Sequence, residues 1–60
     1  MKKFRFHFGR ANGYFDLYYP SYREAVNEVG KVERTCGWFI LGNQAVPARE
    51  ITMIKEVIDD

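Results

Sequence analysis

The residues of this chain best suited to chemistry are a single histidine, His7, and a single cysteine, Cys36. A cysteine nucleophile needs a base within hydrogen-bond reach, so covalent catalysis here would require these two residues to meet. Both have simpler interpretations. Cys36 precedes Gly37 at the start of an apolar run, where a cysteine usually acts as a small buried hydrophobe. His7 falls on the solvent side of a predicted strand, and we therefore expect neither residue to be catalytic.

Other kinds of catalytic site find little support in the sequence. The carboxylates fall mostly on predicted helix faces and at the end of the chain, where they are solvated charges and not a paired acid and base. The stretch FGRANG has two glycines but not the order of a phosphate-binding loop. No set of side chains has metal-ligand spacing. We expect a non-enzymatic protein with no metal and no cofactor.

Length and composition predict one small domain covering residues 1–60. The chain is 47% hydrophobic and 17% aromatic, with a formal net charge of +1. A domain of this size buries only about 60% of the surface of its unfolded chain, so the core must be small. A charge so near zero gives no overall field to attract nucleic acid or an anionic membrane. The unpaired cysteine and the lack of a long apolar run predict a cytoplasmic protein without a membrane span.

The first elements are predicted to form a β-hairpin. Residues 2–8 alternate aromatic and basic side chains, which is the period of a half-buried strand. Asn12-Gly13 favours a type I′ turn, although a bulge at Gly9 would move that turn by one residue. The turn predicts three directly opposed pairs: Phe8 with Leu17, Phe6 with Tyr19, and His7 with Tyr18. The dry face then carries Phe4, Phe6, Phe8, Phe15, Leu17 and Tyr19.

A helix is predicted to follow the second strand. The stretch SYRE matches a capping box, with Ser21 as the N-cap and Glu24 reaching back to it. The helix ends at Gly30 or runs on to about Glu33. Its apolar residues have helical spacing and can lie on the dry face of the hairpin: Tyr22, Ala25, Val26 and Val29.

The second half of the chain is predicted to complete a small antiparallel sheet. Residues 35–42, TCGWFILG, indicate a strand, of which either Trp38 and Ile40 or Phe39 and Leu41 face the helix. The other pair must be covered by the C-terminal segment or by a partner chain. Within residues 47–58 we favour a strand over residues 52–58 that follows a turn at residues 47–50 and pairs with residues 36–42, and a helix starting near Pro47 is the alternative. The expected fold is α+β, ββαββ, with one helix packed on one face of the sheet.

The sheet face away from the helix is the candidate binding surface. It is expected to mix cations with aromatic rings, and Trp38, from the strand at residues 35–42, is a further aromatic candidate. The candidate residues are Lys3, Arg5, His7, Tyr14, Tyr18 and Trp38. Tyr, Trp and Arg are enriched in protein interfaces, which predicts a protein-protein interaction module that can also self-associate.

The same mixture of residues allows two other interpretations of this surface. RNA or single-stranded DNA binding would also use cations and stacking rings, but Asp16 on this face and the net charge of +1 weigh against it. An ordinary solvated face with cross-strand Tyr and Arg pairs is the simplest interpretation.

The layout of KKFRFHF followed by GYFDLYYPSYREAVNEV resembles small phage-encoded accessory proteins that bind and inhibit host enzymes. Some phage inhibitors of host RNA polymerase have a comparable strand-strand-helix-strand order. The resemblance covers about the first half of the chain and carries no functional residue across. It implies a small inhibitor that acts by binding. Those inhibitors are often strongly charged, whereas this chain is nearly neutral, which argues against charge-driven inhibition.

Overall fold

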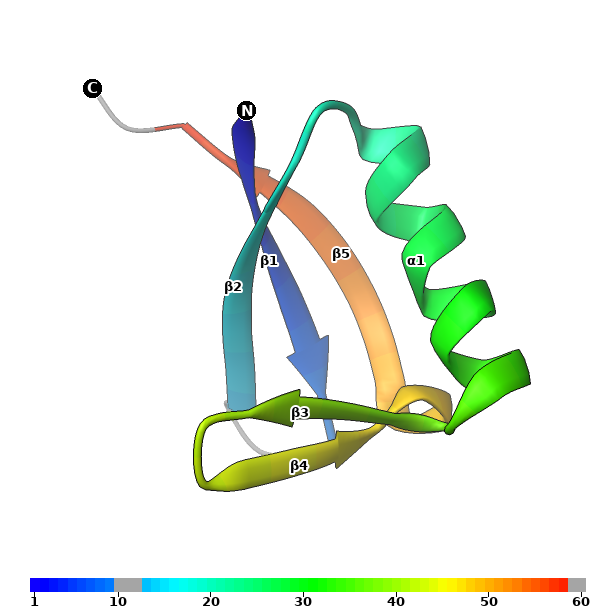
Figure 1. Cartoon of the computed structure of the whole chain (residues 1–60). Helices are drawn as coiled ribbons and strands as arrows, with labels where there is room; N and C mark the ends of the chain where they lie inside the picture. Colours follow the sequence, from blue (N-terminus) through cyan, green and yellow to red (C-terminus); the bar gives the residue numbers. More distant parts are fainter. Residues whose placement is uncertain (10–12, 59–60) are drawn as a thin grey trace.

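Three strands of the computed structural model form an antiparallel sheet, and one helix lies across one of its faces (Figure 1). The structure describes residues 1–9 and 13–58. The sheet has the order β2-β1-β5, and β3 and β4 form a separate two-stranded hairpin. The elements are β1 (Lys2–Phe8), β2 (Gly13–Tyr19), α1 (Tyr22–Thr35), β3 (Trp38–Leu41), β4 (Gln44–Pro47), a 3-10 turn (Ala48–Glu50) and β5 (Ile51–Val57). The predicted α+β class, with one helix and a small antiparallel sheet, is confirmed.

The register between β1 and β2 differs from the predicted one. Phe8 lies opposite Gly13 and Phe6 opposite Phe15, so each β1 residue meets a partner four positions earlier than expected. A Cβ atom at Gly13 would lie 2.9 Å from the Phe8 ring, and glycine therefore gives this ring the room it needs. Because a shift by an even number preserves the alternation, every side chain keeps its predicted face. The predicted turn includes Asn12, which lies outside the described residues.

The helix starts where the sequence predicts and ends later. The Ser21 hydroxyl accepts a hydrogen bond from the Glu24 backbone N–H at 3.3 Å, which confirms the N-cap. The helix continues past both predicted ends because its apolar stripe extends to Val32, which packs against the buried residues of the β3–β4 hairpin. It ends at Thr35. Gly37 then takes a φ of +80°, a left-handed conformation that reverses the chain toward β3.

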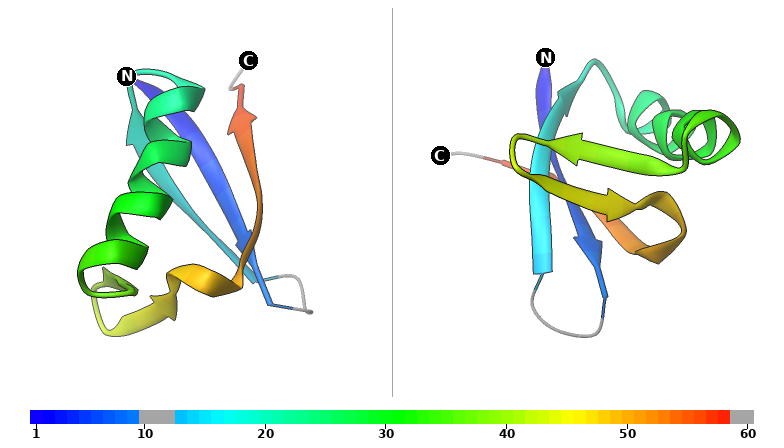
Figure 2. Two further views of the ribbon diagram at one scale, coloured as in Figure 1. Left: turned by 90° about the vertical axis from the view of Figure 1, so that its right-hand side faces the viewer. Right: turned by 60° about the horizontal axis from the view of Figure 1, so that its bottom comes forward.

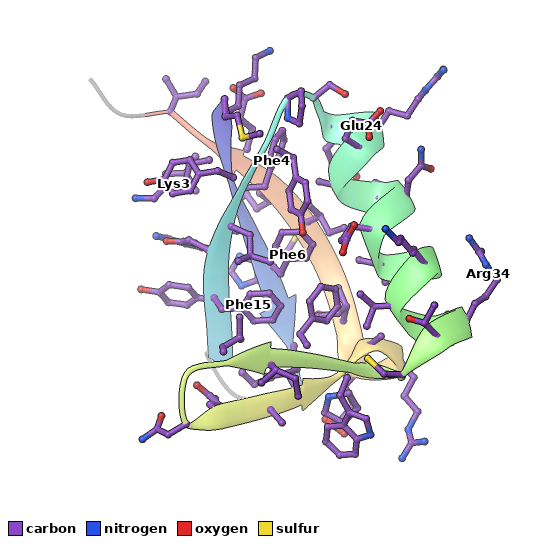
Figure 3. The ribbon with its side chains drawn as sticks, in the orientation of Figure 1. Lys3, Phe4, Phe6, Phe15, Glu24 and Arg34 are labelled. Carbon is purple, nitrogen blue, oxygen red and sulfur yellow. The ribbon has the colours of Figure 1, made fainter. Side chains whose placement is uncertain are left out.

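The core lies between the three-stranded sheet and α1. Phe4, Phe6 and Ala25 are fully buried, and Figure 3 shows Phe4 and Phe6 on the side of the sheet that faces the helix. Not all of the predicted helix stripe is covered. Tyr22 is 54% exposed and Val26 41% exposed, since both lie at the margin of the helix rather than at the centre of its packed face.

The β3–β4 hairpin closes one end of the space between sheet and helix (Figure 2). Phe39 faces this space and is 5% exposed, whereas its neighbours Trp38 and Ile40 point outward. The structure thus decides the facing of β3 that the sequence left open. The Phe39 ring lies 5.8 Å from Phe6 and 5.3 Å from Phe15, so the hairpin is fixed to the sheet through aromatic contacts.

The pairing of the C-terminal strand differs from the prediction. Residues 51–57 do form a strand, but β5 pairs with β1 and not with residues 36–42. The partner of β3 is instead β4, a strand that the sequence reading did not predict. The short turn Ala48–Glu50 redirects the chain between the two sheets, which lets β5 occupy the free edge of β1. Among the described residues, no helix is long and apolar enough to cross a membrane.

We expect the two faces of β3 to differ in their effect on stability. Phe39→Ala should lower the free energy of unfolding by about 3–5 kcal/mol, because it removes a buried ring that joins sheet and hairpin. Trp38→Ala, the matched control on the same strand, should cost less, about 1–2 kcal/mol, because about half of that residue is exposed. Urea denaturation followed by circular dichroism measures both values. Equal losses would contradict this orientation of β3.

Candidate binding surfaces

The sheet face that points away from α1, here called the outer sheet face, carries five of the six predicted site residues. Figure 3 shows Lys3 pointing away from the helix, opposite to Phe4. Tyr14 and Tyr18 are 49% and 58% exposed, and Met53 is 49% exposed. The outer sheet face consists of three cross-strand rows: Tyr18, Lys3 and Val57; Asp16, Arg5 and Lys55; Tyr14, His7 and Met53.

Arg5 is held at the centre of the outer sheet face by two neighbours. Its guanidinium donates to both carboxylate oxygens of Asp16, at 3.0 and 3.2 Å. The same group lies 4.1 Å from the centre of the Tyr14 ring, which is a cation-π contact. The Arg5 side chain is therefore oriented for its neighbours within the fold, and the face presents a polar centre that is already paired.

The charge of Arg5 also affects the acid beside it. The hydrogen bond from Arg5 lowers the pKa of Asp16 from its ordinary value of 3.8, partly opposed by burial, and Lys3 and His7 add weaker attraction. Asp16 is thus ionised at neutral pH and offsets one of the cations on this face. On the other side of the sheet, burial raises the pKa of Tyr19 to about 12, and Glu28 contributes. Tyr19 therefore stays protonated.

Sequence reasoning missed one cation of the outer sheet face. Lys55 lies directly opposite Arg5 because β5 pairs with β1. Its exposed side chain is the second cation of the row that contains Asp16 and Arg5 and, counting Lys3, the third cation of the outer sheet face. The expected pairing of the last strand with residues 36–42 would have put Lys55 elsewhere. Its alternation with Ile54 was visible in the sequence, but the identity of the neighbouring strand was not.

The sixth predicted residue, Trp38, lies on a separate surface. Trp38 is 46% exposed and Ile40 is 69% exposed, and both point outward from β3. Their cross-strand partners on β4 are Pro47 and Ala45. These four residues form an apolar surface, here called the hairpin face, and they are Trp38, Ile40, Ala45 and Pro47.

A third surface is a shallow groove between α1 and β5. Its volume is about 450 Å³. The helix wall includes the exposed side chains of Tyr22 and Val26, and the strand wall includes Ile54. The left view of Figure 2 shows α1 in front of the sheet, with β5 as the strand at the sheet margin. The complete lining is Tyr22, Val26, Val29, Gly30, Ile51, Thr52, Met53 and Ile54.

The two candidate catalytic residues are not brought together. His7 lies on the outer sheet face, with its ring 6.0 Å from that of Tyr14. Cys36 is the C-cap of α1, and its thiol donates to the Trp38 carbonyl at 3.2 Å. Cys36 is exposed, so the prediction of a small buried hydrophobe is wrong; the helix extends further than expected and leaves this residue at its end. The described residues contain no cluster of three or more His, Cys, Asp or Glu suited to a metal ion.

Comparison with protein-family models, with curated proteins and with solved structures finds no match for this chain.

The ion pair between Arg5 and Asp16 should make stability depend on pH. Since the folded pKa of Asp16 is lowered, its stabilisation is complete above the ordinary value of 3.8 and is lost as pH falls below it. Asp16→Asn should therefore cost about 0.5–1 kcal/mol at neutral pH and progressively less in acid. Urea denaturation across this range gives the difference between the two proteins. The exposed control Glu33→Gln should show a much smaller difference, and a loss for Asp16→Asn that stays constant with pH would contradict the assignment.

Proposed function

We propose that this protein is a non-enzymatic protein-binding module that docks through the hairpin face. The observation that carries this proposal is the exposure of Trp38 and Ile40 on a strand whose other face is buried. When large apolar side chains lie in one contiguous exposed surface, their burial by a partner lowers the free energy of the complex. Tryptophan is also among the residues that contribute most to binding when an interface buries them.

The shape of the hairpin face indicates what kind of partner it fits. The hairpin is short, with four residues in each strand, and its outer face carries only four apolar side chains. Stable interfaces usually involve about 20–30 residues on each side, so this face alone is too small to hold a second copy of itself. A larger protein with an apolar pocket, which receives Trp38 and also contacts the surroundings of the hairpin, is the partner we propose.

Two further features fit this function. Cys36 is a free, exposed thiol close to the hairpin face, which is consistent with a reducing compartment, and we propose that the protein acts in the cytoplasm. The resemblance of the N-terminal layout to small phage-encoded inhibitors supports inhibition of the partner as the consequence of docking.

Site-specific photocrosslinking tests the hairpin face in cells. A photoreactive phenylalanine analogue at position 40 should give a discrete protein adduct, whereas the same analogue at the exposed helix position 33 should not. With the identified partner, Trp38→Ala should weaken binding by about 30-fold, the effect expected for an anchoring residue. Ile58→Ser, a change at another exposed isoleucine, should leave the affinity unchanged. The absence of an adduct at position 40, or equal effects of the two substitutions, would overturn the proposal.

A second candidate function is binding of RNA or single-stranded DNA by the outer sheet face. The observation that favours it is the position of Lys55 opposite Arg5, which places three cations near two exposed tyrosine rings. Lysines can hold phosphates while bases stack on Tyr14 and Tyr18. Arg5 would contribute less because Asp16 already binds its guanidinium.

Fluorescence anisotropy with a labelled single-stranded oligonucleotide at low salt tests this second function. Binding should weaken on Tyr18→Ala and on Lys55→Glu, and it should weaken as salt is added because phosphate contacts release counterions. Trp38→Ala serves as the control, since the hairpin face takes no part. The outer sheet face would be excluded as a nucleic-acid site if the oligonucleotide did not bind, or if Tyr18→Ala and Lys55→Glu changed its affinity no more than the control Trp38→Ala did.

A further inference from the structure

The outward edge of β5 is a second place where a partner can bind, separate from the hairpin face. The sheet order β2-β1-β5 puts β5 at one side, so within the described part of the chain its second edge has no neighbouring strand. Edge strands of this kind present unpaired backbone N–H and C=O groups and can accept an added strand. The regular part of β5 is Met53–Val57, because the register shifts near Phe8.

An added strand on β5 would lie along the groove between α1 and β5. Its side chains would alternate between two sides, as in any strand. One set would point into the groove, toward Ile54 and toward the exposed margins of Tyr22 and Val26. The other set would continue the outer sheet face beside Lys55 and Met53. The groove therefore offers apolar contacts, and the edge offers backbone hydrogen bonds.

The charges on β5 restrict the chemistry of such a segment. Lys55 shares the outer sheet face with Arg5, whereas Glu56 shares the opposite face with Phe4. Both Lys55 and Glu56 are exposed. Because directly opposed residues on neighbouring strands interact, an acidic residue suits the position opposite Lys55 and a basic residue suits the position opposite Glu56. An apolar residue suits the position opposite Ile54, at the groove.

We propose that β5 binds an extended peptide segment by strand addition. The segment carries an apolar, an acidic and a basic residue opposite Ile54, Lys55 and Glu56 respectively. Main-chain hydrogen bonds to β5 supply affinity, and the groove and the two charges supply selectivity. Antiparallel pairing of two β5 edges centred on Lys55 or Glu56 would set like charges opposite each other, which disfavours a second copy of this chain in those two registers.

Nuclear magnetic resonance titration of the full chain with short peptides tests this proposal. The probes are the acetylated and amidated pentapeptides TKEVT, which has the required order for an antiparallel addition, and TVEKT, which has it for a parallel one. We expect one of them, added to about 5 mM, to shift the backbone amide signals of β5 and the signals of Tyr22 and Val26. The probe that binds is then made in two N-methylated forms, one methylated at residues 2 and 4 and the other at residues 1, 3 and 5. Only one of the two forms should lose binding, because only one edge of the peptide pairs with β5.

Charge exchange provides the matched control. The exchanged probes TEKVT and TVKET should bind the wild-type chain about tenfold more weakly, and the double variant K55E/E56K should restore their binding. The variant W38S/I40S should bind the probes normally, so loss of the hairpin-face function and loss of this site can be told apart. The proposal would be overturned if neither probe moved the β5 signals, or if the original and exchanged probes bound equally. It would also be overturned if the β5 signals moved with protein concentration alone, a result that would indicate self-association.

Discussion

The contact among the rings of Phe6, Phe15 and Phe39 is the interaction on which the rest of this fold depends. Phe6 and Phe15 stack at 5.1 Å with an interplanar angle of 5°, and Phe39 meets both from the hairpin. The hairpin strands are too short to be stable by themselves in water. Their position follows from the burial of Phe39 and Val46 against the sheet. This contact joins the two sheets in one core, although no strand of one sheet pairs with a strand of the other.

The same small core explains why the outer sheet face and the hairpin face both remain open. One helix of 14 residues covers only the Phe face of the sheet, and no second helix is present among the described residues to cover the opposite face. The outer sheet face is suited to water because its central Arg5 and Asp16 satisfy each other. The hairpin face has no such polar pairing, since Trp38 and Ile40 are its main exposed groups. The burial of apolar area therefore favours docking at the hairpin face, whereas the outer sheet face is stable when solvated.

Features that depend on local periodicity were predictable from the sequence. The alternation in residues 2–8 assigned Phe4 and Phe6 to the core, and Ser21 was identified as the N-cap. The predicted strand pairs were wrong because Asn12-Gly13 suggested a two-residue turn, while Gly13 in fact lies opposite Phe8. The face assignment survived this error because strands repeat every two residues and the register moved by four.

The sequence by itself determined the α+β class, the start of the helix and the dry face of the hairpin formed by β1 and β2, because these depend on neighbours within a few residues. Only the tertiary structure decided that Trp38 points outward, that Lys55 joins Arg5, and that β5 forms an edge beside α1. Each of these depends on which distant strands pair. A strand carries the same alternation whichever neighbour it has, and the choice is made by how the aromatic rings can be buried together.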